Sequence, residues 1–275
     1  MNKKIIALIC TVAVLAAGIV LLSFAIRNKA NEEDLYSSYY TLDEDFIIEA
    51  SNGCMSQKKN TVEFIKTAYN SGANCIELDL TFDPSGVPYI ESSPYNINSG
   101  SLMLEQVLKL LSDDPIYKND MLDLKVNSAD NMPLVEELCT KYNMTGRVFL
   151  SGISVNQASY IKSNCSLPFY VTMDIKYSND KGYLSDIYSD ISNSFAVGLI
   201  CDADEMSDLL AAILHENWID ISFENINSKH DCIKALKKSP KRIKTNKPYE
   251  VLEIVQTWQN EAPIEYYGIE TTTDK

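Results

Sequence analysis

The chain has 275 residues, of which 45% are hydrophobic and 23% are charged, with only 10 glycines and 9 prolines. This length and composition fit one large folded domain or two small ones, and they exclude a disordered or collagen-like protein. The 38 acidic and 24 basic residues give a net charge of −14, which argues against binding to a phosphate backbone, so we expect no nucleic-acid partner.

An uncharged, apolar run begins the chain. Residues 5–26 carry no charge, and a helix of that length would span roughly 33 Å, enough to cross the hydrocarbon core of a bilayer. The run is longer than the about 7–15 apolar residues usual in a cleaved signal peptide, and no small-x-small cleavage site ends it. We therefore predict that residues 1–29 form an uncleaved, single-pass anchor in the cell membrane. Residues 30–45 would form a tether, and the domain beyond it would be extracellular.

Eight apolar runs suited to buried parallel strands follow the tether, separated by amphipathic stretches of helical period. The runs are residues 46–50, 75–82, 121–126, 147–152, 169–175, 195–202, 218–224 and 242–246. The helical stretches include 61–71, 104–111, 206–214 and 249–258, the last preceded by Pro248. Eight strand–helix alternations predict an α/β fold, a (β/α)8 TIM barrel over residues 46–260, with 261–275 as a C-terminal tail. A doubly wound open sheet is the alternative, although no GxGxxG or P-loop motif supports its nucleotide-binding form.

Acidic residues interrupt the apolar runs at alternating positions. Glu77 and Asp79 share one face of the second run, and Asp123 lies on the corresponding face of the third. Because the apolar neighbours should face helices, we expect these carboxylates to converge inside the barrel, at the strand ends that carry the chemistry of TIM barrels. Converging carboxylates require a cation or a proton, so the pattern predicts an oxygen-ligand site for Ca²⁺ or Mg²⁺. The alternative is a solvated polar face on an antiparallel strand.

Several motifs resemble those of glycerophosphodiester phosphodiesterases, which are TIM barrels. The chain has Asn60-Thr61, GANCIELD at 72–79, DPSGVP at 83–88, LEQVL at 104–108, Asp123-Leu124-Lys125 and TNKP at 245–248. They are similar to the family's Glu-Asn-Thr, Gly-Ala-x-x-Ile-Glu-x-Asp, Asp-Gly-Val-Pro, Leu-Glu-x-x-Leu, Glu-x-Lys and Thr-Asp-x-Pro. The resemblance implies a phosphoric diester hydrolase of lipid metabolism, whose metal lies on Glu77, Asp79 and Asp123. It also implies a glycerophosphodiester or glycerophosphate ligand, which Lys125 would help to bind.

The departures from the family bear on activity. The family's two histidines, which the resemblance implies are the general acid and base, fall on Ala50 and Ser92, at the ends of the first and second strands facing the carboxylates. The family's arginine falls on Ser51, and its substrate-covering insertion shrinks to about residues 95–101. Alanine and serine cannot replace imidazole in proton transfer. We therefore expect a catalytically impaired barrel, a pseudoenzyme that still binds a divalent cation or a phosphoester.

Two histidines and one lysine are the remaining candidates for catalysis. We expect His215 at a helix C-terminus on the opposite end of the barrel, whereas His230 follows the seventh strand and can reach the functional end. The alternative for His230 is a solvated residue at a helix start, and for Lys125 a structural ion pair. Two other functions stay open beside the impaired barrel. They are an active metal-dependent phosphodiesterase that uses Lys125 or His230, and a non-catalytic scaffolding ectodomain.

Overall fold

The computed structural model describes residues 45–51 and 54–261. The predicted anchor at 1–29, the tether up to residue 44 and the tail from residue 262 lie outside the described residues. The described residues up to Gln259 belong to one compact unit. Among the helices that the structure describes, none combines the length and the apolar character needed to span a membrane.

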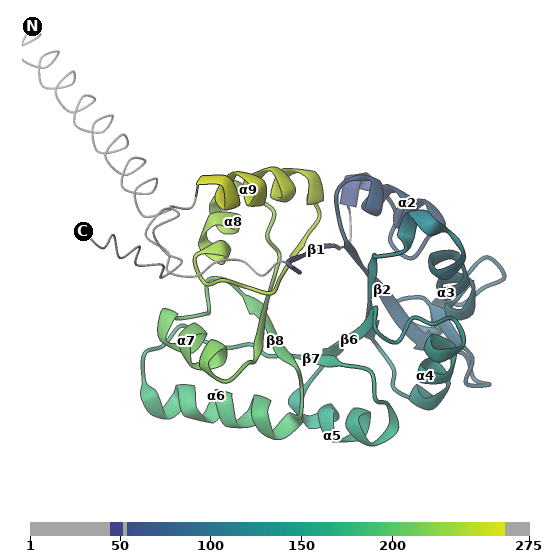
Figure 1. Ribbon diagram of the computed structural model, residues 1–275. Coiled ribbons are helices and arrows are strands. Elements are labelled where there is room, and N and C mark those ends of the chain that lie inside the picture. The colour runs from purple at the N-terminus through teal and green to yellow at the C-terminus, as the bar shows by residue number, and fades with distance from the viewer. Residues whose placement is uncertain (1–44, 52–53, 262–275) are drawn as a thin grey trace, which may run out of the picture. The chain divides into compact units, whose positions relative to one another are not determined.

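Eight parallel strands close into a barrel (Figure 1). They are β1 (Ile47–Ala50), β2 (Cys75–Phe82), β5 (Met121–Val126), β6 (Val148–Ile153), β7 (Phe169–Thr172), β8 (Gly198–Asp202), β9 (Asp220–Glu224) and β10 (Arg242–Thr245). The first strand, β1, pairs in parallel with both β2 and β10, so the sheet has no open edge between its first and last barrel strands. This closure confirms the predicted TIM barrel and excludes the open doubly wound sheet.

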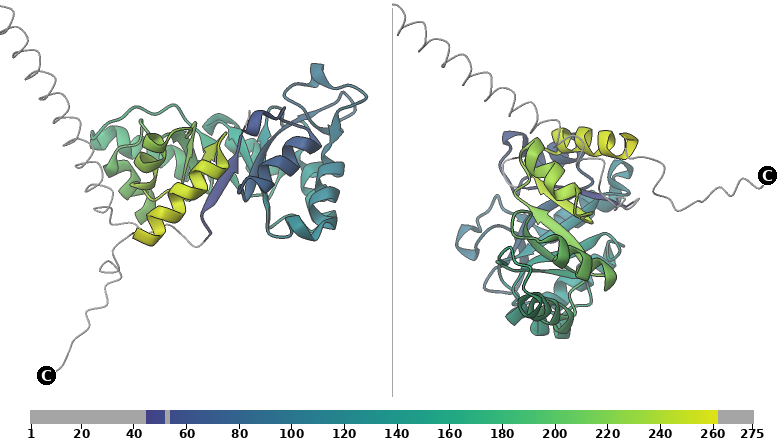
Figure 2. Two further views of the ribbon diagram at one scale, coloured as in Figure 1. Left: turned by 90° about the horizontal axis from the view of Figure 1, so that it is seen from above. Right: turned by 90° about the vertical axis from the view of Figure 1, so that its left-hand side faces the viewer.

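A helix follows each barrel strand and packs against the outside of the ring, as Figures 1 and 2 show. The helices are α2 (Val62–Asn70), α3 (Leu104–Asp113), α4 (Met132–Lys141), α5 (Val155–Asn164), α6 (Lys181–Ser194), α7 (Asp208–Glu216), α8 (Lys229–Leu236) and α9 (Pro248–Glu261). Three short 3-10 turns are η1 (Cys54–Ser56), η2 (Pro94–Asn96) and η3 (Pro115–Tyr117). The four predicted helical stretches are confirmed, and Pro248 starts α9 as expected.

Two short antiparallel strands, which the apolar pattern did not predict, lie between β2 and α3. The strand β3 (Pro88–Ile90) pairs with the end of β2, and β4 (Leu102–Met103) pairs with β3. A tight turn joins β2 to β3, in which the Asp83 carboxylate accepts hydrogen bonds from the backbone N–H groups of Ser85 and Val87. Strands of two or three residues are too short to show an alternating pattern.

Two barrel strands begin later than predicted. Phe195 and Trp218 have left-handed backbone conformations (φ 62° and 58°), and they are 67% and 94% exposed. Phe195 ends α6, and Trp218 donates its N–H to the carbonyl of His215 at the end of α7. Bulky apolar residues are typical of strands, so the sequence pattern placed both residues in strands. Each instead belongs to the turn between a helix and the next strand.

The inward face of the barrel changes from apolar to polar along the strands. A buried apolar cluster consists of Ile47, Cys75, Phe149, Tyr170 and Ile200. Two residues further along the same strands, toward their C-terminal ends, lie Glu49, Glu77, Ser151, Thr172 and Asp202. Because side chains alternate with a period of two, these polar residues share the inward face with the cluster. The interior of the barrel is therefore filled by a layer of apolar side chains and, nearer the C-terminal ends of the strands, by a layer of polar side chains.

Candidate functional site

Six buried charged side chains and the half-buried Lys59 form what we call the charged cluster inside the barrel. It contains four acids and three bases, which are Glu49, Glu77, Asp79, Asp123, Lys59, Arg242 and Lys244. The strands supply six of them at inward positions, and Lys59 comes from the segment before α2. Among the described residues, the cluster is the densest concentration of buried charge, so its internal pairing decides what the site can bind.

Arg242 lies at the base of the charged cluster. Its guanidinium contacts Glu49 at 2.8 Å and Asp123 at 3.3 Å, and its Nε donates to Ser222 Oγ at 2.7 Å. The aromatic rings of Phe149 and Tyr170 lie 4.4 and 4.2 Å from the guanidinium carbon. This side chain is completely buried, and it joins the apolar plug to the carboxylates above it through stacking and ion pairing.

Lys244 lies two residues further along β10 and pairs with three carboxylates. Its ammonium is 3.2 Å from Glu49 Oε1 and 3.7 Å from Asp123 Oδ2, and it donates a hydrogen bond to Glu77 Oε2. Burial would lower the pKa of Lys244, but the neighbouring Glu49 and Glu77 raise it above its ordinary value. The lysine therefore stays protonated and acts as a fixed positive charge.

Lys59 neutralises the other side of the cluster. Its ammonium bonds to Glu77 Oε1 and, at 3.0 Å, to Asp79 Oδ1. The side chain of the next residue, Asn60, forms two hydrogen bonds with Asp79. Its Nδ2 donates to Asp79 Oδ2 at 2.9 Å, and its Oδ1 accepts from the backbone N–H of Asp79 at 3.0 Å. Thr61 then caps α2 by accepting a hydrogen bond from the Phe64 N–H. Three consecutive residues thus anchor the start of α2 to β2.

The acids of the cluster titrate in opposite directions. Burial and the nearby charge of Glu49 raise the pKa of Asp123 to about 8, against the smaller opposing effects of Lys244 and Arg242. Burial would also raise the pKa of Glu77, but Lys244 and Lys59 more than offset it and hold that pKa well below its usual range. With four acids against three bases, most of the charge in the charged cluster is compensated without any added ion.

Glu49, Glu77 and Asp123 have the donor type and spacing of a cation site. One oxygen from each lies within 4.8 Å of the other two, so this acidic triad can hold a metal ion. Two of the three were predicted as ligands, whereas Glu49 takes the place expected for Asp79. All three carboxylates are already paired with Lys59, Lys244 or Arg242, although Oδ1 of Asp123 has no hydrogen-bond partner among the described residues. A metal would have to compete with these side chains.

Ala50 does not face the carboxylates, contrary to the sequence-based expectation. Glu49 points inward to Arg242 and Lys244, so alternation along β1 places Ala50 on the outward face, where it is completely buried. Pairing with β10 continues through Ser51, whose N–H donates to the carbonyl of Thr245 at 2.8 Å. Ser51 therefore returns to the inward face and is the position from which an imidazole could reach the charged cluster.

Ser92 lies after β3 and not at the end of the barrel strand β2. It is exposed, and its hydroxyl accepts a hydrogen bond from the Asn96 amide at 2.9 Å. The register of β3 runs back along β2, with Ile90 opposite Leu80, so the chain after Ile90 continues toward the level of Asp79. An imidazole at this position would approach the site from the hairpin side.

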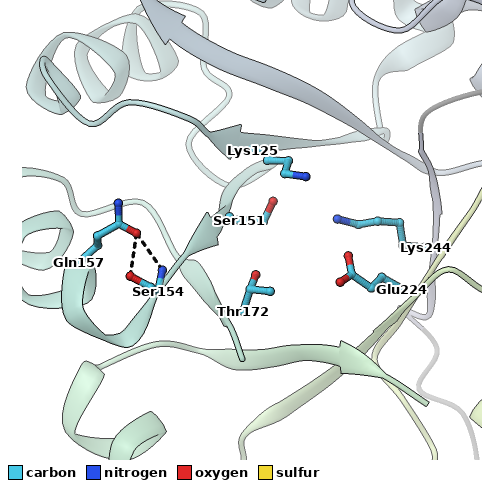
Figure 3. Close-up of a pocket in the computed structure, with 8 residues that line it drawn as sticks. Lys125, Ser151, Ser154, Gln157, Thr172, Glu224 and Lys244 are labelled. Atoms are coloured by element: carbon cyan, nitrogen blue, oxygen red, sulfur yellow. Dashed lines mark hydrogen bonds between the residues drawn. The ribbon is translucent and has the colours of Figure 1, made fainter. Parts of the chain in front are cut away.

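A cavity of about 220 Å³ opens beside the charged cluster at the C-terminal ends of the strands. It is lined by Lys125, Ser151, Gly152, Ser154, Gln157, Thr172, Glu224 and Lys244. Figure 3 shows Lys125, Ser151, Thr172, Glu224 and Lys244 directed into the same space. The hydroxyl oxygen of Ser151 is buried and has no hydrogen-bond partner among the residues that the structure describes.

Gly152 makes room for Lys125 in this cavity. Its backbone has a φ of +70°, and a Cβ there would lie 3.0 Å from Lys125 Cγ. Glycine adopts this backbone conformation without strain, and its missing side chain lets the lysine stem pass close to β6. Lys125 forms no ion pair with any residue that the structure describes. Its ammonium is therefore available to an anion, unlike those of Lys59 and Lys244.

The two histidines lie away from the charged cluster. His215 is in the last turn of α7, and its Nε2 is 2.9 Å from the carbonyl of Lys238, as expected for the end of the barrel remote from the cavity. His230 is the second residue of α8, exposed, and does not line the cavity. The geometry favours the solvated helix-start alternative for His230.

The sequence missed four members of the charged cluster, for two reasons. Arg242, Lys244 and Glu49 alternate with apolar residues on β10 and β1, the same signal that identified Glu77 and Asp79, and it could have revealed them. Lys59 lies in an irregular segment, where no periodicity gives its direction. Its nearest signal is its place directly before the Asn60-Thr61 pair.

Comparisons with known proteins identify the fold. No protein-family model matches the chain, and no curated protein matches it. Among solved structures, a putative glycerophosphodiester phosphodiesterase from Galdieria sulphuraria is similar, with a TM-score of 0.63 and 14% identity over 77% of this chain and 98% of the other. A glycerophosphodiester phosphodiesterase from Agrobacterium tumefaciens has a TM-score of 0.61 and 13% identity, over 76% of this chain and 99% of the other.

A phosphodiesterase from Oleispira antarctica, in complex with the product sn-glycerol-3-phosphate, is also similar. Its TM-score is 0.57 and its identity 11%, over 76% of this chain and 96% of the other. The structural neighbours are thus TIM barrels of the glycerophosphodiester phosphodiesterase type, as the motifs at residues 72–79 and 123–125 predicted. At these identities the likeness shows the fold, and the function has to be argued from the site.

Proposed function

We propose that the chain is a glycerophosphodiester phosphodiesterase-like protein that binds a phosphoester at the C-terminal end of its barrel and hydrolyses it poorly. The observation that carries this proposal is the cavity beside the charged cluster. It brings together the ammonium of Lys125 and the hydroxyl of Ser151, neither of which has a partner in the described part of the chain. An ammonium and hydroxyl donors converging in one cavity suit the oxygens of a phosphate.

The start of α5 adds to this donor set. Ser154 and Gln157 line the cavity and form the capping box of that helix, in which the Ser154 N–H donates to Gln157 Oε1 at 3.0 Å. The N-terminus of a ten-residue helix therefore opens toward the cavity, and it carries a partial positive charge that favours anions. Glu224 is the single carboxylate among the lining residues, against the two ammonium groups of Lys125 and Lys244.

The proposed catalytic impairment rests on what surrounds the cavity. None of its lining residues is a histidine, and Ser51 and Ser92 occupy the positions from which imidazoles could reach the site. Lys244, whose pKa is raised by Glu49 and Glu77, stays protonated and is a poor general base at neutral pH. The predicted ligands Glu77, Asp79 and Asp123 remain our proposal for any Ca²⁺ or Mg²⁺ that the protein binds. Such an ion would polarise a phosphoryl oxygen.

Removal of the Lys125 ammonium should weaken phosphoester binding. For the full chain in detergent, we expect calorimetric titration with sn-glycerol-3-phosphate in the presence of chelator to show binding. Lys125→Met should weaken it by about 10–100-fold, the effect of losing one hydrogen bond to a charged group. Lys162→Met removes the same charge from an exposed position in the last turn of α5 and should leave affinity unchanged. Equal affinities in the two variants, or no binding to the parent, would reject the cavity as a phosphoester site.

We also propose that residues 1–29 anchor the protein in the cell membrane with the barrel outside. The support is the uncharged run at residues 5–26, whose length suits a bilayer. Protease added to intact cells should then degrade the barrel while a cytoplasmic marker stays whole. If the barrel survives under conditions that cut a known external protein, the proposed orientation is wrong. Deletion of residues 1–29 should release the barrel from the membrane fraction.

The two other functions predict different results. An active phosphodiesterase would hydrolyse glycerophosphodiesters at ordinary enzyme rates without any substitution, and a scaffolding ectodomain would bind neither sn-glycerol-3-phosphate nor a cation. The unpaired Lys125 and Ser151 favour the ligand-binding function over a scaffold, because a buried hydroxyl without a partner costs folding free energy that a bound ligand recovers.

A further inference from the structure

We propose that the ammonium of Lys59 takes the place of a divalent cation between Glu77 and Asp79, so that metal and Lys59 exclude one another. Divalent cations would therefore bind weakly between these two carboxylates in the native protein. This inference goes beyond the proposed function, because phosphoester binding by Lys125 does not require it. Lys59 does not line the cavity. It supplies the charged cluster with a positive charge that belongs to the chain itself.

The positions of the oxygens carry the inference. The Lys59 ammonium bonds to one oxygen of Glu77 and one of Asp79, and therefore lies in the gap between the two predicted metal ligands. A Ca²⁺ ion bound by the same oxygens would lie about 2.3–2.6 Å from each of them. Ion and ammonium cannot occupy that gap together. The remaining oxygens are engaged as well, Glu77 Oε2 by Lys244 and Asp79 Oδ2 by Asn60.

The chain holds Lys59 in this place through its neighbours. Asn60 has a left-handed backbone (φ 65°) and is hydrogen-bonded to Asp79, and Thr61 caps α2. The backbone next to Lys59 is therefore held in place. The Lys59 side chain is only 10% exposed, a burial that is unfavourable for a lysine unless carboxylates compensate it. Lys58, its neighbour with the same charge, is exposed.

Charge supports the same conclusion. The charged cluster already contains three cations against its acids, and a divalent ion would add two positive charges beside Lys59, Lys244 and Arg242. Displacement of Lys59 into solvent would relieve part of this repulsion.

The test compares divalent-cation binding by the parent, Lys59→Met and the control Lys58→Met, each as the full chain in detergent. Calorimetric titration and melting temperature are measured with Ca²⁺, Mg²⁺ or Mn²⁺. We expect Lys59→Met to bind at least one of these ions at least about tenfold more tightly than the parent, and to melt at a higher temperature when it is bound. Lys58→Met should behave like the parent.

Two results would overturn the inference. One is equal metal affinity in the parent and Lys59→Met, and the other is a folded Lys59→Met that binds none of the three ions. If Lys59→Met does not fold without metal, Lys59→Gln gives the same comparison, because its amide can still donate to a carboxylate while the charge is gone. Titration of sn-glycerol-3-phosphate in chelator is independent of these measurements, so failure here and failure of the proposed function can be told apart.

Discussion

Replacement of Arg242 by methionine should lower the free energy of unfolding by about 3–5 kcal/mol, the usual effect of removing one partner from a buried ion pair. Glu49 and Asp123 would lose the guanidinium that contacts them at 2.8 and 3.3 Å. Lys244 would remain as a second cation for both, so complete loss of pairing is not expected. The stacking of the guanidinium on the rings of Phe149 and Tyr170 would be lost as well. Urea unfolding followed by circular dichroism measures the change.

Two further variants separate charge from shape at this position. Arg242→Lys keeps the charge but loses the planar fork and its stacking, so its stability should fall between those of the parent and Arg242→Met. Lys247→Met removes a cation that is 47% exposed just beyond β10, and should change stability by less than about 0.5 kcal/mol. If Arg242→Met is as stable as Lys247→Met, the charged cluster does not stabilise the barrel as we describe.

The barrel could be predicted because its signals are local. Each strand carries its own apolar run, and eight runs separated by amphipathic stretches leave few folds to consider. The hairpin of β3 and β4 was missed because a strand of two or three residues has no pattern. Phe195 and Trp218 were misplaced because a bulky apolar residue at a helix end has the composition of a strand.

The charged cluster was only half predictable, because pairing joins residues that are distant in the sequence. Alternation shows that Glu77 and Asp79 point inward. It cannot show that Arg242 pairs with Asp123, because the two residues are 119 positions apart in the sequence. The Ala50 error has another cause. Counting back from Asn60 crosses a segment outside the strands, where one inserted or deleted residue would shift the count, whereas alternation within β1 depends only on adjacent residues. The register of the strand places Ser51 inward, where the count had placed Ala50.

Hydrolysis should appear when imidazoles are placed at Ser51, which the register of β1 directs toward the charged cluster, and at Ser92, in the chain that follows β3. The variant that tests this carries Ser51→His and Ser92→His together, in a Lys59→Met background with millimolar Ca²⁺. A positioned general acid or base contributes about 10²–10⁴-fold, so we expect the rate of glycerophosphocholine hydrolysis to rise by at least about 10²-fold over the same background without histidines. Each single histidine should give less than the pair, because acid and base act on one transition state and their effects are not additive.

The matched control moves one imidazole by a single residue. Ala50→His with Ser92→His has the same composition of added groups, but alternation directs the side chain at position 50 away from Glu49 and toward the helices. It should give no increase over Ser92→His alone, and it should lower the melting temperature because Ala50 is fully buried. Equal rates for the Ser51 and Ala50 versions would contradict the assigned inward face. Ordinary enzyme rates in the unsubstituted protein would contradict impairment itself, and Lys125 would then be the residue to replace first.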